Sequence, residues 1–401
     1  MAAIADVRVL DAHPSWTLVE VVADDGTTGI GLTQSPVAVI RPIIEHGPAA
    51  LGQRLIGREP LEVEELWQSM WIGWGSQNGR GDEGGLAVNA MAALDLATWD
   101  LAGKLQNQPI WRLLGGQVQG RVMAYASSSA FVSSSYEYGG TDWRLKNPDR
   151  LADESAGYVR EGFRAMKYGW GANFGAEDRV RLAAIRDAVG PDVRWMVDVG
   201  CPDYWTAGWS VEAAIEALEV LAELGAFFVE EPLPPKDVAG HARVTEAAAG
   251  RVHVATGESL TTVDEFRRFI DAGAVTILQP DACQIGITQL VAVARLAGEA
   301  GILVAPHSPW SAIAVAAHLN VLTTVDNGVL VEYPAVASFE PGSRAGEITR
   351  LTNFEIVEHP PTIVGGYLVP SERPGLGLGG FVPEALDRLA ALREPVAAGA
   401  A

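Results

Sequence analysis

Eight short runs of apolar, strand-like residues alternate with helical patterns over most of the chain, and this alternation restricts the fold more than any other feature. In one helical stretch, residues 211–224, the side chains of Ala214, Ile215, Leu218 and Leu221 fall on one face. Eight strands alternating with helices predict a (β/α) barrel rather than a doubly wound sheet. No glycine-rich dinucleotide fingerprint follows the first run, which favours the same choice. The runs lie at residues 121–126, 163–168, 193–198, 227–230, 252–257, 275–279, 302–305 and 328–331.

The two ends of the chain carry patterns that differ from this repeat. Residues 4–34 read as an antiparallel β-meander, because apolar runs are separated there by the turn Asp24-Asp25-Gly26. Residues 36–114 follow a helical period, and residues 350–390 return to short strands and glycine-proline turns. We therefore expect an α/β chain made of a (β/α) TIM-type barrel and an α+β capping domain. The expected parts are 1–118 for the N-terminal capping domain, 119–345 for the barrel, and 346–401 for a C-terminal segment that packs back on the capping domain.

Composition excludes several classes of partner. The formal net charge of −21 argues against a nucleic-acid or anionic-membrane partner, because both need clustered lysine and arginine. The only cysteines, Cys201 and Cys283, are too few for a disulfide framework and fit a reduced, cytoplasmic setting. No signal-peptide pattern opens the chain, and no run of about 18 apolar residues predicts a membrane span. We expect a cytoplasmic protein without a membrane or nucleic-acid partner.

Three carboxylates stand where strand-like runs stop: Asp198, Glu230 and Glu258. They are 32 and 28 residues apart, which is about one strand–helix–strand repeat of a barrel of roughly 250 residues. A single carboxylate at such a position is more often a helix N-cap or a solvated loop residue. Three in phase at neighbouring strand ends instead predict a Mg²⁺ site with positions left open for substrate oxygens.

Four more strand ends carry residues that could do chemistry: Lys167, Asp281, His307 and Glu332. Lys167 precedes Asp198 by 31 residues, and the other three follow the last of the carboxylates at intervals of 23, 26 and 25. A metal at the mouth would polarise a substrate carboxylate and hold the charge left when a neighbouring proton is removed. His307 is the candidate base, with Asp281 one strand earlier to orient its ring.

A histidine beside a proline is by itself more often a hydrogen-bonded structural residue. His307 is preferred only because it is in phase with the three carboxylates. The remaining histidines lack such placement and are interpreted as structural; they are residues 13, 46, 241, 253, 318 and 359.

Several motifs together resemble the enolase superfamily, specifically the mandelate racemase subgroup of acid-sugar dehydratases. The resemblance covers nearly the whole chain. It implies a modified (β/α)7β barrel, metal ligands Asp198, Glu230 and Glu258, a His307–Asp281 dyad, and Glu332 as a substrate or hydrogen-bonding group. It also implies a homo-oligomer with an even number of subunits. The matching stretches are residues 93–104 (ALDLATWDLAGK), 113–116 (LLGG), 229–232 (VEEP), 257–259 (GES), 279–282 (QPDA), 305–307 (APH) and 374–377 (PGLG).

The chain departs from that resemblance at the second barrel strand. Many relatives end this strand with Lys-x-Lys, and the second lysine is a base opposite the histidine. Here the order is Lys167-Tyr168-Gly169, so glycine stands where the second lysine would be. Along a strand residues 167 and 169 share a face and Tyr168 points to the other one. Lys167 is therefore expected as a cation near the substrate carboxylate, with a role as base the less favoured alternative.

The missing second base weighs against a racemase, which must deliver and remove protons on opposite faces. Dehydration needs one base, so we expect Mg²⁺-dependent conversion of a sugar acid, an aldonate or aldarate, to a 2-keto-3-deoxy acid. A cycloisomerase that opens a sugar-acid lactone or anhydro-sugar acid needs the same groups and remains an alternative. A non-enzymatic barrel would have no need of both Asp281 and His307. Tyr168 and Trp310 lie where they could line the substrate pocket, although aromatic residues there are as often packing residues. The loops at 11–16 and 72–85 are expected to select the sugar.

Overall fold

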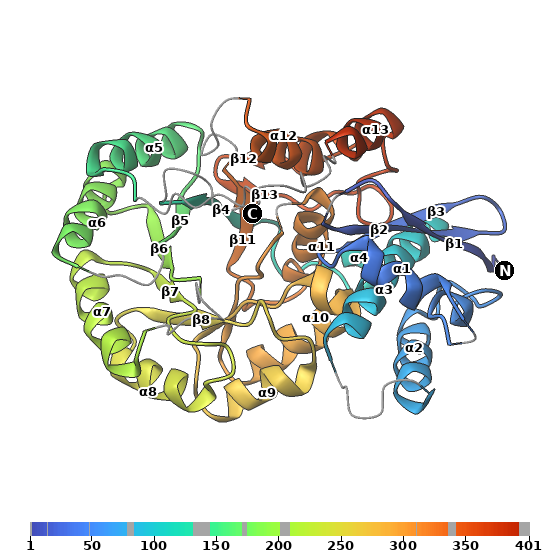
Figure 1. Cartoon of the computed structure of the whole chain (residues 1–401), viewed down its shortest axis with the longest axis horizontal. Helices are drawn as coiled ribbons and strands as arrows, with labels where there is room; N and C mark the ends of the chain where they lie inside the picture. The colour runs from blue at the N-terminus through green and yellow to red at the C-terminus, as the bar shows by residue number, and fades with distance from the viewer. Residues whose placement is uncertain are drawn as a thin grey trace, which may run out of the picture.

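The N-terminal part of the chain is a three-stranded antiparallel meander covered by helices, as the sequence predicts. The computed structural model describes residues 2–13, 15–47, 49–77, 84–130, 145–170, 175–200, 209–309, 311–335 and 342–392. Strand β2 lies between β1 and β3. The meander and its helices lie to the right of the barrel in Figure 1. The elements are β1 (Ile4–Leu10), β2 (Thr17–Ala23), β3 (Thr28–Thr33), α1 (Val37–Glu45), α2 (Val63–Gln77), α3 (Leu86–Leu105) and α4 (Ile110–Leu113).

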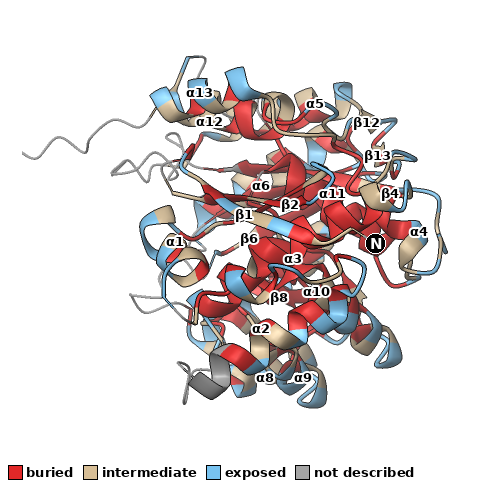
Figure 2. Cartoon of the chain, turned by 90° about the vertical axis from the view of Figure 1, so that its right-hand side faces the viewer, coloured by how far each residue is buried: buried red, intermediate tan, exposed pale blue. Residues whose placement is uncertain are grey.

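Helix α3 packs directly against β3, and two glycines make this possible. A Cβ atom on Gly29 would lie 2.0 Å from the Ala97 carbonyl oxygen, and one on Gly31 would lie 2.1 Å from that of Ala93. Both distances are far inside van der Waals contact, so no residue with a side chain fits there without moving the helix. Helix α3 is consequently buried over most of its length (Figure 2).

Eight parallel strands form the barrel, one for each run that the sequence predicts. From β4 to β10 each strand pairs with the next, and β11 pairs with β4. A parallel bridge between Val304 and Gly328 joins β10 to the segment that leads into β11 and closes the ring. The strands are β4 (Val122–Ser129), β5 (Ala165–Gly169), β6 (Arg194–Asp198), β7 (Phe228–Glu230), β8 (His253–Thr256), β9 (Ile277–Leu278), β10 (Leu303–Val304) and β11 (Leu330–Pro334).

In the described part of the chain, each barrel strand except the last is followed by one helix on the outside of the barrel (Figure 1). This order is the (β/α)7β arrangement that the family resemblance implies. Alternate strand residues point inward, and Tyr125, Met196, Phe228 and Leu330 belong to the apolar cluster that fills the interior. The helices are α5 (Pro148–Arg160), α6 (Ala176–Val189), α7 (Val211–Leu224), α8 (Val238–Ala248), α9 (Val263–Asp271), α10 (Ala282–Glu299) and α11 (Ala312–Leu322).

The C-terminal segment returns to the N-terminal helices. Asp100 of α3 is buried, and its carboxylate accepts hydrogen bonds from the backbone N–H groups of Ile30 and Leu376 and from the Lys104 ammonium. One side chain thereby fastens β3, α3 and the C-terminal segment together. The segment contains α12 (Arg344–Arg350), a π-helical turn at Leu351–Glu355, β12 (Ile363–Val364), β13 (Tyr367–Leu368) and α13 (Pro383–Ala391).

A second buried aspartate of α3 joins the N-terminal part to the barrel. Helix α10 is kinked at Gly286, whose φ of 76° is left-handed. Just after the kink, the N–H and the hydroxyl group of Thr288 donate to the Asp95 carboxylate at 2.9 and 2.6 Å. Burial raises the pKa of Asp95 to about 7, even though these hydrogen bonds act to lower it.

None of the helices within the described ranges has the length and apolar character that crossing a membrane requires.

Candidate active site

The residues predicted from strand ends meet at the carboxyl end of the barrel. Strand register places Asp198 beside Glu230, and Gly169 beside Asp198. The place where these strand ends meet is the mouth of the barrel. The predicted residues that it brings together are Lys167, Asp198, Glu230, Glu258, Asp281, His307 and Glu332.

Lys167 is buried at the centre of the acidic groups. Its ammonium lies 2.9 Å from both carboxylate oxygens of Glu230, 3.0 Å from Asp198 Oδ2 and 3.4 Å from Glu332 Oε1. Burial alone would lower the pKa of Lys167, but the three negative charges hold it well above its usual value. In this arrangement Lys167 is a positive charge held among three carboxylates.

His307 and Asp281 form a hydrogen-bonded pair at the other side of the mouth. His307 Nδ1 lies 3.0 Å from Asp281 Oδ2. Burial acts to raise the pKa of Asp281, but the hydrogen bond with His307 is among the contacts that bring it down to about 2. Because an ionised carboxylate can only accept, Nδ1–H of His307 is the donor and Nε2 is left for chemistry.

The second ring nitrogen, Nε2 of His307, lies 3.7 Å from Glu258 Oε2. Burial opposes the charged imidazolium, yet the negative charge of Glu258 and the hydrogen bond to Asp281 keep the pKa of His307 well above its usual value. Glu258 is one of the expected Mg²⁺ ligands, so a bound cation would offset its charge and lower the pKa of His307, which leaves Nε2 able to accept a proton.

Glu332 is held by partners that the sequence analysis did not identify. Ser127 Oγ donates to its Oε1 at 2.6 Å, and the Ser308 N–H donates to its Oε2 at 2.8 Å. Burial would raise the pKa of Glu332, but Lys167, His307 and these donors lower it overall. The carboxylate is thereby fixed in its charged form.

Gln279 is another functional candidate that sequence reasoning missed. Its amide Nε2 donates to Glu230 Oε2 at 2.6 Å. The residue lies in the stretch 279–282 that carries the family resemblance and stands two positions before Asp281, so its place at a strand end was a signal. Ser127, near the end of β4, offered no comparable signal because serine is common at such positions.

A divalent cation such as Mg²⁺ prefers oxygen ligands, and the carboxylates of Asp198, Glu230 and Glu258 supply them. All three offer hard oxygen ligands, and Asp198 Oδ1 is buried without a hydrogen-bond partner in the described part of the chain. Burial and the charge of Asp198 raise the pKa of Glu230 well above its usual value, so a bound cation would relieve a real repulsion. Within the described ranges, no three acidic, histidine or cysteine side chains converge closely enough to hold an ion as they stand. In place of a cation, the Lys167 ammonium contacts the carboxylates of both Asp198 and Glu230.

One of the two expected pocket residues, Tyr168, is not brought to the mouth. Tyr168 is buried between β5 and α5, and its hydroxyl group forms a hydrogen bond with Ser155 Oγ at 2.8 Å, so it points away from Lys167. Trp310 lies outside the described residues. In the expected specificity loop at 72–85, helix α2 continues to Gln77, and residues 78–83 lie outside the described residues.

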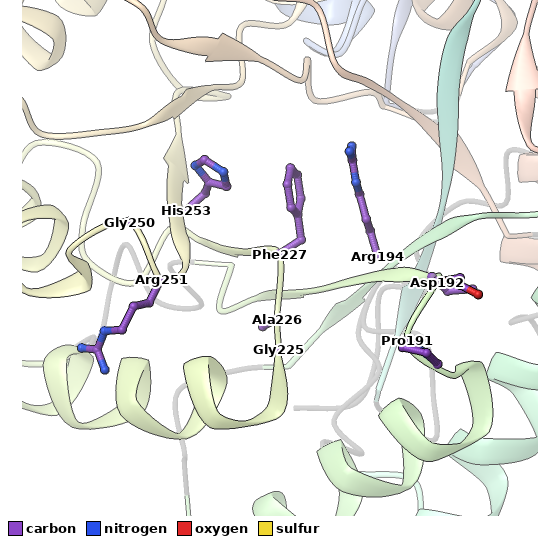
Figure 3. A pocket seen from close by; sticks show the side chains of 10 residues that line it. Pro191, Asp192, Arg194, Gly225, Ala226, Phe227, Gly250, Arg251 and His253 are labelled. Carbon is purple, nitrogen blue, oxygen red and sulfur yellow. The ribbon is translucent and has the colours of Figure 1, made fainter.

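A hollow of about 410 Å³ lies at the opposite, amino-terminal end of β6, β7 and β8 (Figure 3). The Arg194 guanidinium stacks over the Phe227 ring at 4.6 Å, and that ring meets His253 edge-on at 5.0 Å. None of the carboxylates of the mouth lines it. In barrels of this kind the amino-terminal end serves stability, whereas catalysis takes place at the carboxyl end.

Two family profiles cover most of the chain. Residues 150–379 match the one described as Enolase C-terminal domain-like. Residues 11–115 match the Mandelate racemase / muconate lactonizing enzyme, N-terminal domain. The matches agree with the fold and the motifs described above.

Relatives of known activity extend over nearly the full length. A D-galactarolactone cycloisomerase from Agrobacterium fabrum is 31% identical over 369 residues, covering 90% of this chain and 88% of that protein. A D-galactonate dehydratase from Cronobacter sakazakii is 30% identical over 382 residues, covering 91% and 88%.

Solved structures show the same architecture. A 3,6-anhydro-D-galactonate cycloisomerase from Zobellia galactanivorans superimposes with a TM-score of 0.79 at 26% identity, covering 96% of this chain and 99% of that one. A racemase from Streptomyces coelicolor with bound magnesium superimposes with a TM-score of 0.75 at 26% identity, covering 97% and 99%. Similar folds in this group thus carry different reactions.

Proposed function

Because the chain belongs to the mandelate racemase/muconate lactonizing enzyme family of the enolase superfamily, we propose that it removes the proton next to a substrate carboxylate with the help of Mg²⁺. The proposed reaction is dehydration of a sugar acid, an aldonate or aldarate, to a 2-keto-3-deoxy acid. The sugar-acid substrate is inferred from the D-galactonate and D-galactarolactone in the names of the relatives.

One observation carries this proposal: among the described residues, a base is present on only one side of the mouth. His307 offers a free Nε2 while Asp281 occupies its Nδ1. On the other side the cation of Lys167 is bound by three carboxylates, and the residue that shares its face two positions later is Gly169. One base suffices for dehydration, whereas a racemase needs two that oppose each other.

In the proposed reaction, Nε2 of His307 takes the proton from the carbon next to the substrate carboxylate. The electron pair of that C–H bond forms a C=C bond as the hydroxyl group on the neighbouring carbon leaves. His307 then returns its proton to the leaving hydroxide, so water is released, and the enol rearranges to the 2-keto-3-deoxy acid. Asp281 holds the ring of His307 in the tautomer that these transfers require.

The other residues act on charge and position. Mg²⁺, held by Asp198, Glu230 and Glu258, would stabilise the negative charge that develops on the substrate carboxylate. Lys167 adds a fixed positive charge beside that site. Glu332, with both oxygens fixed by Ser127 and Ser308, is positioned to accept hydrogen bonds from substrate hydroxyl groups.

Cycloisomerisation of a sugar-acid lactone or anhydro-sugar acid is the second candidate. It uses the same proton removal by one base, and the 31% identical relative from Agrobacterium fabrum is named for such a reaction. The difference between the two reactions lies in which oxygen leaves, and this depends on the substrate that the loops admit.

The test is a library of acid sugars incubated with purified protein and Mg²⁺, with 2-keto-3-deoxy products detected as semicarbazones. A product that disappears with EDTA and with His307→Asn, while Mg²⁺ binding survives in that variant, supports dehydration. Lactone opening seen by NMR without a keto acid supports cycloisomerisation. Full turnover by His307→Asn would show that the base is misassigned. Light scattering of the same preparation tests the even-numbered homo-oligomer that the family implies.

A further inference from the structure

A second histidine lies directly behind the His307–Asp281 pair. His318 belongs to α11 and is fully buried. Its Nε2 lies 3.0 Å from the backbone nitrogen of Ala282, the first residue of α10, and 3.5 Å from Asp281 Oδ1. Its place in the sequence indicates only a structural role.

The hydrogen bond with Ala282 fixes the tautomer of His318. A backbone N–H can only donate, so Nε2 accepts and the ring proton is on Nδ1. Among the described residues, Nδ1 has no hydrogen-bond partner. A buried unpaired N–H costs free energy, and a phenylalanine or leucine filling the same space would avoid that cost. The acceptor atom Nε2 is therefore what distinguishes histidine here from an apolar core residue.

His318 acts on the peptide rather than on the carboxylate of Asp281. The separation of 3.5 Å from Oδ1 exceeds the length of a charge-assisted hydrogen bond. Oδ1 already accepts from the Cys283 N–H at 2.8 Å. The imidazole thus holds Ala282, which lies between Asp281 and Cys283. It thereby also holds the first turn of α10.

Two contacts consequently join neighbouring units of the barrel. Asp281 and Ala282 belong to the β9–α10 unit, whereas His307 and His318 belong to the β10–α11 unit. His307 bonds to Asp281 at the mouth, and His318 accepts from the N–H of Ala282, the first residue of α10. The Cys283 N–H holds Oδ1 of Asp281, and His318 holds the adjoining Ala282 peptide. Together these contacts keep Oδ2 facing Nδ1 of His307.

We propose that His318 is a positioning residue for the proton transfer: it holds the Asp281–Ala282 peptide so that Asp281 keeps His307 in its productive orientation. This inference rests on the proposed function for its effect on turnover. Its effect on the His307–Asp281 hydrogen bond does not depend on any substrate.

The first test compares His318→Phe with His318→Gln. The phenylalanine fills the space but cannot accept from Ala282, so kcat should fall about 10- to 100-fold, as for other residues that orient a functional group, with KM changed less than about twofold. The glutamine offers an oxygen acceptor in nearly the same place and should restore kcat to within about threefold of wild type.

The matched control is His241→Phe. His241 is also a fully buried histidine, but it lies on α8, where its Nδ1 is 3.0 Å from the Asp237 carbonyl oxygen and its ring packs against Phe269. Its loss should lower thermal stability about as much as loss of His318, without changing kcat.

The second readout is the Nδ1–H proton resonance of His307 in ¹⁵N-histidine-labelled protein with Mg²⁺ added. His318→Phe should shift or broaden this signal, whereas His241→Phe should leave it unchanged. This readout still decides the matter if the wild-type protein turns over no acid sugar, so failure of the proposed function can be distinguished from failure of this inference.

The inference is overturned if folded His318→Phe keeps wild-type kcat and an unchanged His307 resonance. If this variant does not fold, His318→Leu replaces it in the comparison with His318→Gln. Equal kcat values and equal His307 resonances in the leucine and glutamine variants would likewise show that His318 serves only as a core residue.

Discussion

The two ends of strands β6, β7 and β8 carry opposite chemistry. The carboxyl ends present buried or half-buried carboxylates around one lysine, and the amino ends present an arginine, an aromatic ring and a histidine around an open hollow (Figure 3). At the amino ends the charges are mostly exposed: Arg194 stacks on a ring, and Arg251 forms an ion pair with Glu219 at the surface.

This difference in burial distinguishes residues that serve stability from residues that serve chemistry. Exposed pairs such as Arg251–Glu219 are screened by water and contribute little to the free energy of unfolding. At the mouth, burial and mutual repulsion raise the pKa of Glu230, and the charge of Lys167 opposes this rise. An arrangement that costs stability and is nevertheless built by three neighbouring strands indicates a functional site.

The largest expected effect concerns the base at the mouth. His307→Asn should lower kcat by about 10²- to 10⁴-fold, the usual contribution of a general base, while thermal stability changes little. Steady-state kinetics on the substrate found in the screen measures it. The exposed His359→Asn is the control and should keep wild-type kcat. Comparable losses in both variants would contradict a special role for His307.

The next effect concerns the buried cation. Lys167→Met should lower the free energy of unfolding without Mg²⁺ by about 3–5 kcal/mol, because three carboxylates lose the positive charge that offsets them. Urea denaturation followed by circular dichroism measures it. Arg194→Met at the amino end should cost less than about 1 kcal/mol. Equal losses at the two ends would remove the distinction drawn between them.

A buried carboxylate outside the mouth, Asp95, makes a pH-dependent contribution. Its pKa is raised from 3.8 to about 7, so between these values the folded state binds more protons than the unfolded state. Stability from this group is therefore full below about pH 4 and falls as the pH rises through 7. Relative to wild type, Asp95→Asn should gain up to about 4 kcal/mol between pH 4 and pH 8.

Urea denaturation at several pH values measures this gain. Asp25→Asn is the control, because Asp25 is exposed and its pKa is lowered by hydrogen bonds with Thr27, so it contributes no loss of stability in that window. A constant difference between Asp95→Asn and wild type from pH 4 to pH 8 would contradict the expected titration.

A smaller effect is expected from metal binding. Mg²⁺ at about 100 times its dissociation constant should stabilise the wild-type protein by about 2.7 kcal/mol relative to EDTA. Calorimetric unfolding with and without the metal measures this. Glu230→Gln removes one of the charged donors and should lose most of the gain, whereas Glu219→Gln at the amino end should retain it. Full stabilisation of Glu230→Gln would place the ion elsewhere.

Much of the fold follows from local sequence pattern. The meander and all eight barrel strands lie where apolar runs and turns predict them, because each pattern reports which side of an element is buried. The regular spacing also explains why residues far apart in sequence, such as Lys167 and Glu332, come within 3.4 Å. Parallel strands bring all their carboxyl ends to one edge.

The features that sequence did not reveal depend on contacts between elements. Ser127 reaches Glu332 only because β11 pairs with β4, and His318 reaches Ala282 only because α11 packs on α10. The direction of Tyr168 was indicated by strand alternation, yet its aromatic character favoured the pocket; the structure gives it Ser155 as a partner instead. Helix α2 extends further than expected because two glycines do not suffice to end it.

The hydrogen bonds between α3 and the kinked helix α10 affect how the molecule unfolds. Asp95 and Trp99 bond to Thr288, and Asn89 bonds to Gln284, so polar groups of α10 have their partners in the N-terminal part of the chain. A barrel without that part would expose these groups at the kink, a few residues from Asp281. We therefore expect the N-terminal part and the barrel to unfold in one cooperative transition.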